Sequence, residues 1–108
     1  MIKIVNTVSP FQYKLTLTGH AEYDKSGNDI VCAAISALVQ TLAYSVVEHG
    51  FDVDHINLSP GNTVICIHRE QEDAIKTAQA EAIWSAIILG IETIAKQYKK
   101  NINYRSVG

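Results

Sequence analysis

The chain has few of the features that mark an exported or disulfide-stabilised protein. Its 108 residues include only two cysteines, too few for a framework of disulfide bonds. The N-terminal residues, MIKIVNTVSP, contain no apolar segment as long as that of a secretory signal. We therefore expect a cytoplasmic protein whose thiols stay free in a reducing compartment.

Positive charge is also scarce. Charged residues make up 19% of the chain and its formal net charge is −2, whereas a non-specific nucleic-acid binder needs clustered lysine and arginine. The one basic cluster is Lys96, Lys99 and Lys100, which fits the end of a helix, where the helix dipole favours cations. We expect no direct contact with nucleic acid.

Sequence motifs for phosphate or dinucleotide binding are missing. The turn-like stretch SPGNT lacks the lysine and the following helix of a phosphate-binding loop, so we expect no cofactor. The uncharged run Ile30–Val47 is only at the lower length limit for a membrane span, and it contains four polar residues. It is better explained as a helix buried within the protein or between subunits, and we expect no membrane partner.

The pattern of apolar residues predicts one domain over residues 1–108 with the element order ββαββαβ. Hydrophobic residues make up 47% of the chain, which suffices for a core. Alternation predicts strands, and uninterrupted helical patterns predict helices from Asp29 to Glu48 and from Glu72 to Tyr98. The predicted strands cover residues 2–8, 12–18, 51–58, 63–69 and 101–107. This order favours a two-layer α+β fold, with a mixed or antiparallel sheet and two helices.

The second predicted helix carries more apolar surface than one sheet can cover. Acidic residues are expected in its first turn and lysines in its last. Its apolar residues exceed a single stripe, and the first helix is apolar nearly all round. Because large apolar patches are seldom left exposed, we expect a homodimer with helices at the interface. The alternative is a sheet curled enough to bury both helices within one chain.

A histidine and a cysteine flank the polar stretch that precedes the first helix. With Asp29 as the N-cap, Cys32 is the third helical residue, where backbone N–H groups lack partners within the helix. Such groups stabilise a thiolate, and they can also stabilise the oxyanion that forms when a carbonyl is attacked. Cys32 is therefore a candidate nucleophile.

His20 follows the end of a predicted strand and is the candidate base for this cysteine. Asp29 can orient the imidazole, cap the helix, or do both. Ser36 lies one turn beyond Cys32 on the same helix face, as a polar contact at the site or as a small packing residue. From the residues alone, a buried packing cysteine with an unrelated histidine nearby explains the pattern slightly better than a nucleophile with its base.

The stretch resembles the signature of the ribosomal-processing cysteine protease family called Prp. The matching residues are Gly19-His20-Ala21 and the run from Gly27 to Ser36, GNDIVCAAIS, with the spacing between them intact. The chain length and the predicted element order are also similar to the family's, so the resemblance extends over the whole chain.

The resemblance implies a cytosolic homodimeric endopeptidase, with residues 1–108 as its protease domain. It implies removal of a short N-terminal extension from large-ribosomal-subunit protein twenty-seven, after two aromatic residues. Carried over, Cys32 is the nucleophile and His20 the general base, while Asp29 and Ser36 match further functional positions. Gly19 and Gly27 match glycines around a mobile substrate loop.

Two other functional classes remain open at this point. A dimeric, ribosome-associated binding module would keep the fold and use Cys32 only for packing. A thiol redox sensor would oxidise Cys32 reversibly, although no second cysteine lies near it in the sequence. Cys66 and His68 project to one face of a predicted strand and could form half of a zinc site, but core packing explains Cys66 better, since no further ligand pair completes four ligands.

Overall fold

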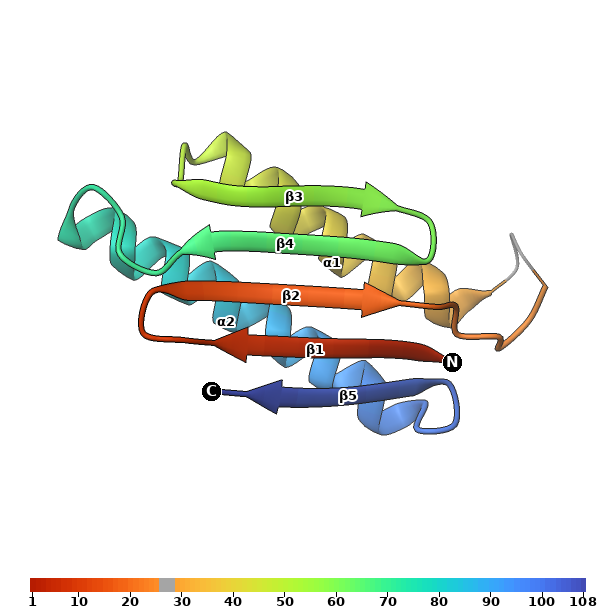
Figure 1. The fold of residues 1–108 in the computed structure, drawn as a ribbon. Coiled ribbons are helices and arrows are strands. Elements are labelled where there is room, and N and C mark those ends of the chain that lie inside the picture. The colour runs from red at the N-terminus through yellow and green to blue at the C-terminus, as the bar shows by residue number, and fades with distance from the viewer. Residues whose placement is uncertain (26–28) are drawn as a thin grey trace.

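The computed structural model describes residues 1–25 and 29–108. These residues form two helices and a sheet in the order ββαββαβ, so the predicted α+β fold is confirmed (Figure 1). The elements are β1 (Ile2–Val8), β2 (Gln12–Thr18), α1 (Ile30–Glu48), β3 (Val53–Ser59), β4 (Asn62–His68), α2 (Ala74–Gln97) and β5 (Ile102–Val107).

The five strands of the described residues form one mixed sheet in the order β3-β4-β2-β1-β5. The hairpins β1–β2 and β3–β4 are antiparallel, and β2 joins them by pairing antiparallel with β4. Only β5 is parallel to its neighbour, β1, because α2 carries the chain back along the sheet before β5 begins. As a result, the end of β2, the β3–β4 turn and the start of α1 lie at the same end of the sheet (Figure 1).

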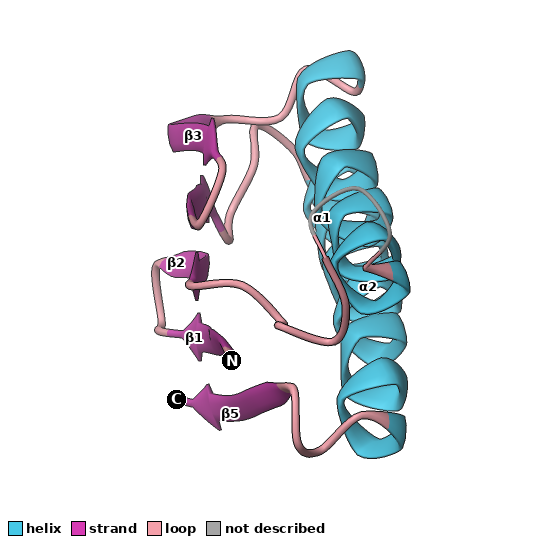
Figure 2. Cartoon of the chain, turned by 90° about the vertical axis from the view of Figure 1, so that its right-hand side faces the viewer, coloured by secondary structure: helices cyan, strands magenta, loops and turns pink. Residues whose placement is uncertain are grey.

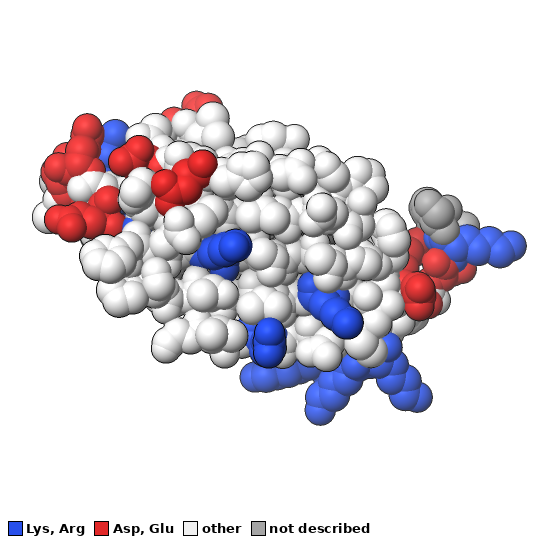
Figure 3. Space-filling view, viewed as in Figure 1, with Lys and Arg blue, Asp and Glu red and all other residues white. Residues whose placement is uncertain are grey.

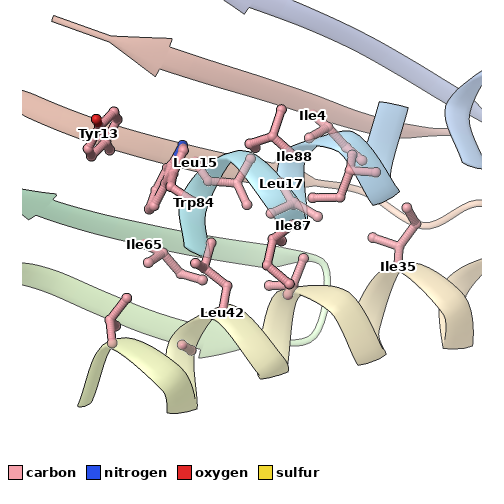
Figure 4. Close-up of a cluster of buried hydrophobic side chains, with 14 of the residues drawn as sticks. Ile4, Tyr13, Leu15, Leu17, Ile35, Leu42, Ile65, Trp84, Ile87 and Ile88 are labelled. Carbon is pink, nitrogen blue, oxygen red and sulfur yellow. The ribbon is translucent and has the colours of Figure 1, made fainter. Parts of the chain in front are cut away.

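Both helices cover the same face of the sheet, which gives the molecule two layers (Figure 2). The strands turn alternate side chains toward the helices, and Ile4, Leu15 and Ile65 are fully buried there. Figure 4 shows these strand residues meeting Leu42 of α1 and Ile87 of α2. The core thus consists of the space between the two layers.

Trp84 of α2 is tied to the central strands by an aromatic contact and a polar one. Its ring stacks on Tyr13 with 5.3 Å between ring centroids, and its Nε1–H donates to Oδ1 of Asn6 at 3.0 Å. Asn6 is buried, so this bond satisfies a polar group that would otherwise be costly to bury. The contact fixes how α2 lies across β1 and β2.

The helix ends follow local capping rules. Asp29 caps α1, as predicted, and the chain leaves this helix at Gly50 with φ of +68°. The prediction that α2 begins at Glu72 with acidic residues in its first turn is wrong. Asp73 is instead extended and caps the helix, accepting from the Lys76 N–H at 2.8 Å, because a carboxylate satisfies that amide best from just before the first turn.

The outer side of the helix layer remains largely apolar. Only 33% of the most apolar window of α1 and 22% of that of α2 are buried, and both helices are long and apolar enough to cross a membrane by length and composition alone. Core helices of soluble proteins pass the same test, and these two pack on the sheet. Tyr44 and Leu89 are each 65% exposed on this outer side.

The opposite face of the sheet carries charges of both signs. Asp and Glu side chains gather mainly at one end, around the start of β3 and the connection from β4 to α2, with a smaller group at the opposite end, and Lys and Arg side chains lie mostly in the lower part of the view (Figure 3). Lys3 and Lys14 are exposed residues of β1 and β2 on this side. The absence of direct nucleic-acid binding stays a prediction.

Candidate active site

The candidate residues meet at the end of the sheet where β2 stops. The Gly19 N–H donates to the Gly61 carbonyl in the β3–β4 turn at 3.0 Å, which joins the two segments. Gly19 has φ of +83°, and a Cβ there would lie 2.5 Å from the Met1 carbonyl oxygen. Only glycine fits this exit from β2, which leads directly to His20.

Cys32 lies in the first turn of α1 and is partly buried. Its Sγ accepts a hydrogen bond from the Ala21 N–H at 3.3 Å. This donor comes from the loop after β2, not from the helix. The sequence offered no sign of this contact, because an alanine contributes only its backbone amide.

The N–H groups of Val31, Cys32 and Ala33 at the start of α1 are already occupied. Asp29 Oδ1 accepts from the N–H groups of Val31 and Cys32 at 3.0 and 2.9 Å, and the Ala33 N–H donates to the Asp29 carbonyl. In this conformation these three amides are not free to receive an oxyanion, contrary to what the sequence predicts for them. The strong cap that the sequence indicated uses the donors that such a site would need.

His20 lies at the same site, but its ring rests on the β3–β4 turn. A Cβ at Gly61 would lie 3.0 Å from Nε2 of His20, so the glycine leaves room for the imidazole. Among the hydrogen bonds of the described residues, none joins His20 to Cys32. His20 is exposed, and exposed side chains change rotamer within nanoseconds.

Asp29 is a helix cap with an additional contact to the loop. Its Oδ2 accepts from the Tyr23 N–H at 3.0 Å, and the carboxylate has no hydrogen bond to His20 among the described residues. Desolvation raises the pKa of this carboxyl, but hydrogen bonds from the N–H groups of Cys32 and Tyr23 outweigh it and leave the pKa below its ordinary value of 3.8. Of the two roles that the sequence left open, the structure shows the cap.

We expect Asp29→Ala to lower the free energy of unfolding by about 1–2 kcal/mol, because backbone donors of α1 and the loop lose their acceptor. Asp73→Ala, which removes the cap of α2, is the matched control and should cost about as much. Only Asp29→Ala should also slow peptide cleavage, because Asp29 caps the turn of α1 that carries Cys32, whereas Asp73 caps α2. Urea unfolding and a cleavage assay measure the two effects, and equal cleavage rates would contradict this role of Asp29.

The lowered pKa of Asp29 also determines how the stability of the fold changes at acid pH. A carboxyl whose pKa is lower in the folded state stabilises the fold fully above its unfolded pKa, and this contribution is lost as pH falls through the folded pKa. Below about pH 3.8 the native protein should therefore lose stability more steeply than Asp29→Ala. Urea midpoints measured across the acid range test this.

A cavity of about 360 Å³ lies between the first half of α1 and the β3–β4 turn. Both His20 and Cys32 line it, together with the predicted site residues Gly19 and Ser36. Gly27 lies outside the described residues. The other lining residues are Ile2, Leu17, Ile35, Val39, Gln40, Leu58, Ser59, Pro60, Gly61, Asn62 and Thr63. Polar and aliphatic groups share the lining, so apolar surface lies in the same recess as a thiol and an imidazole, which suits a bound peptide.

Sequence reasoning missed the residues that hold the loop after β2. The Asn101 Nδ2 group, which follows α2, donates to the Ala21 carbonyl at 3.0 Å, across 80 residues of sequence. The ring of Tyr23 packs edge-on against the ring of Tyr98, with 5.6 Å between the ring centroids. No local pattern could reveal these contacts, because they depend on where α2 ends relative to β2.

The second cysteine and its neighbouring histidine form no metal site. Cys66 is buried, and His68 Nε2 lies 2.7 Å from Oδ1 of Asp54. Among the described residues there is no group of three or more potential ligands that could hold a metal ion. Burial, reinforced by the Asp54 charge, raises the pKa of the Cys66 thiol, so this thiol stays protonated.

Comparison with known proteins identifies related sequences over nearly the whole chain. The family model described as cysteine protease Prp matches residues 1–103. A ribosomal processing cysteine protease Prp of Mycoplasma pneumoniae is 33% identical over 104 residues, which cover 96% of this chain and 93% of that protein. The protein of the same name in Bacillus subtilis is 29% identical over 87 residues, covering 80% of this chain and 78% of that one.

Solved structures share the fold. The S. aureus ribosomal processing protease Prp, in complex with a covalently linked product peptide, has a TM-score of 0.81 and covers 98% of this chain and 99% of its own. A second structure, of the same S. aureus protease with a substrate peptide, gives a TM-score of 0.74 with 98% and 99% coverage. Sequence identities are 24% and 23%, so these two similarities establish the architecture.

Proposed function

The chain belongs to the cysteine protease Prp family, and from this premise we propose that it removes a short N-terminal extension from large-ribosomal-subunit protein twenty-seven. It is a cysteine endopeptidase, and we propose that residues 1–108 act as one catalytic domain. The relatives from Mycoplasma pneumoniae and Bacillus subtilis are ribosomal processing cysteine proteases, which supports this proposal. The observation that carries it is a thiol and an imidazole that line one cavity together with aliphatic side chains.

In the proposed mechanism Cys32 is the nucleophile and His20 the general base. His20 rotates off Gly61 and takes the thiol proton, and the sulfur adds to the scissile carbonyl carbon. The tetrahedral intermediate collapses as the imidazolium protonates the departing amine, which leaves a thioester on Cys32. Water, deprotonated by His20, then hydrolyses the thioester, and the proton returns to the thiol.

The cavity supports a substrate with large apolar residues before the cut. Ile35 and Val39 from α1 and Leu58 from β3 line it beside the sulfur. Leu58 is 39% exposed in the unliganded chain, which leaves apolar surface for a substrate side chain to cover. We propose that these three residues contact the aromatic side chains of the substrate, and that Gly19 and Ser36 contact its backbone.

A cleavage assay tests the proposed function. The native protein is incubated with a synthetic peptide that spans the N-terminal extension and the first mature residues, and the products are weighed by mass spectrometry. We expect one cut, after the paired aromatic residues. A peptide with both aromatics replaced by alanine is the control and should stay intact.

The alternative is a non-catalytic, ribosome-associated binding module. One observation favours it, namely that His20 lies on Gly61 without a hydrogen bond to Cys32. Under this alternative the peptide binds but stays uncut, which the same assay detects. A redox sensor predicts reversible oxidation of Cys32 and no hydrolysis.

We propose further that the protein is a cytoplasmic homodimer that pairs through its helix layer. Most of the two apolar helix windows is left unburied within one chain, and Tyr44 and Leu89 project from it. Pairing of two such layers removes this surface from water. Sedimentation at micromolar concentration should give twice the mass of the chain, 11.9 kDa, and a monomer there would contradict the proposal.

A further inference from the structure

The backbone N–H of Ala21 donates a hydrogen bond to the candidate nucleophile. The Ala21 nitrogen lies 3.3 Å from Cys32 Sγ, whereas the N–H groups of Val31 and Cys32 are taken up by the Asp29 side chain. Ala21 itself is 1% exposed, so this donor is shielded from water. A shielded donor stabilises a negative charge on sulfur more than a solvated one does.

The other end of Ala21 is held by a residue from a distant part of the chain. Asn101 Nδ2 donates to the Ala21 carbonyl at 3.0 Å. The backbone of Asn101 is itself fixed, because its N–H donates to the Tyr98 carbonyl and its own carbonyl accepts from the Ile2 N–H, each at 2.9 Å. Asn101 therefore links the end of α2 and the start of β1 to the segment that faces the sulfur.

From this geometry we infer that Asn101 is a positioning residue, which holds the Ala21 backbone so that its N–H stabilises the thiolate of Cys32. The inference rests on the proposed function, because it assigns a role to Asn101 only if Cys32 is the nucleophile. Asn101 touches neither the sulfur nor the cavity, and it acts through Ala21 alone. Without it, the Ala21 backbone is free to turn away from the sulfur.

Alkylation of Cys32 by iodoacetamide, a neutral reagent, tests the inference without any substrate. The modified peptide is followed by mass spectrometry, which separates Cys32 from Cys66. Asn101→Asp is the sharpest variant, since aspartate has the same shape but its carboxylate cannot donate to the Ala21 carbonyl. Asn101→Ala removes the side chain altogether, and Asn103→Ala, at an exposed position of β5, is the matched control.

We expect both Asn101 variants to slow alkylation about threefold to tenfold at neutral pH, the effect of weakening one hydrogen bond to a charged group. The difference should close at strongly alkaline pH, where the thiol ionises without help. Cleavage should fall by a similar factor, mainly in kcat, and Asn103→Ala should match the native protein. If one Asn101 variant is poorly folded by circular dichroism, the other decides.

Two outcomes would overturn the inference. One is that the native Cys32 reacts fast and the Asn101 variants are alkylated at the same rate as the native protein at every pH. The other is a loss of equal size at every pH, which would mean altered access to Cys32. A native Cys32 no more reactive than a cysteine in an unstructured peptide would instead count against the proposed function, so the two failures are distinguishable.

Discussion

Cys32→Ala should reduce cleavage of the extended substrate peptide by at least about 1,000-fold, because no other group can form the thioester. The fold should be retained, since Cys32 is only partly buried and alanine keeps the Cβ in the first turn of α1. The measurement is kcat/KM by quantitative mass spectrometry, together with a thermal melt. Binding of the peptide should persist in this variant.

The second cysteine provides the matched control. Cys66→Ala removes a buried thiol from β4 and should cost about 1 kcal/mol of stability. Its activity should remain near that of the native protein, because burial keeps the Cys66 thiol protonated and it does not line the cavity. If Cys32→Ala still cleaved while Cys66→Ala did not, the nucleophile would be wrongly assigned.

His20→Ala should lower kcat/KM by about 100- to 10,000-fold, the range over which a positioned general base contributes. Added imidazole should restore part of the rate, because the space left by the side chain is open to the cavity and to solvent. His55→Ala is the control, since His55 is an exposed residue of β3 outside the cavity. Full activity of His20→Ala, with no response to imidazole, would show that His20 is not the base.

The β3–β4 turn allows a milder test of the same base. Gly61→Ala adds a Cβ about 3.0 Å from His20 Nε2, and Gly50→Ala adds one in ordinary van der Waals contact, 3.7 Å from Lys76 Nζ, at a similar positive φ. Both should lose stability to a similar degree, because alanine is strained at positive φ. Only Gly61→Ala should also change the rate of cleavage, because its Cβ displaces the imidazole. If both variants changed the cleavage rate equally, the loss of stability alone would explain the effect.

Local sequence patterns were sufficient for most of the fold. The alternation in residues 12–18 identifies β2 and its buried face, and the N-cap at Asp29 fixes the start of α1. The start of α2 was misjudged by two residues. Glu72 and Asp73 are both acidic, and the sequence does not say whether a carboxylate will cap a helix or enter its first turn.

The candidate site was only partly accessible to the same reasoning. His20 and Cys32 were found from their spacing and from the family resemblance, and both line the cavity. The sequence did not reveal how the two side chains lie relative to each other, because the position of the His20 ring depends on Gly61 in another hairpin. Asn101 was missed because asparagine is common near helix ends, and its partner is a backbone carbonyl that any residue could supply.

The sequence by itself determined which segments fold into strands and helices, which residue types meet at the candidate site, and the family to which the chain belongs. These depend on short-range periodicity, on capping and on a contiguous motif. Only the tertiary structure decided which groups surround the sulfur, because the order β3-β4-β2-β1-β5 brings the β3–β4 turn beside the end of β2. Strand pairing and helix packing set those neighbours, and both are long-range interactions that leave no local pattern in the chain.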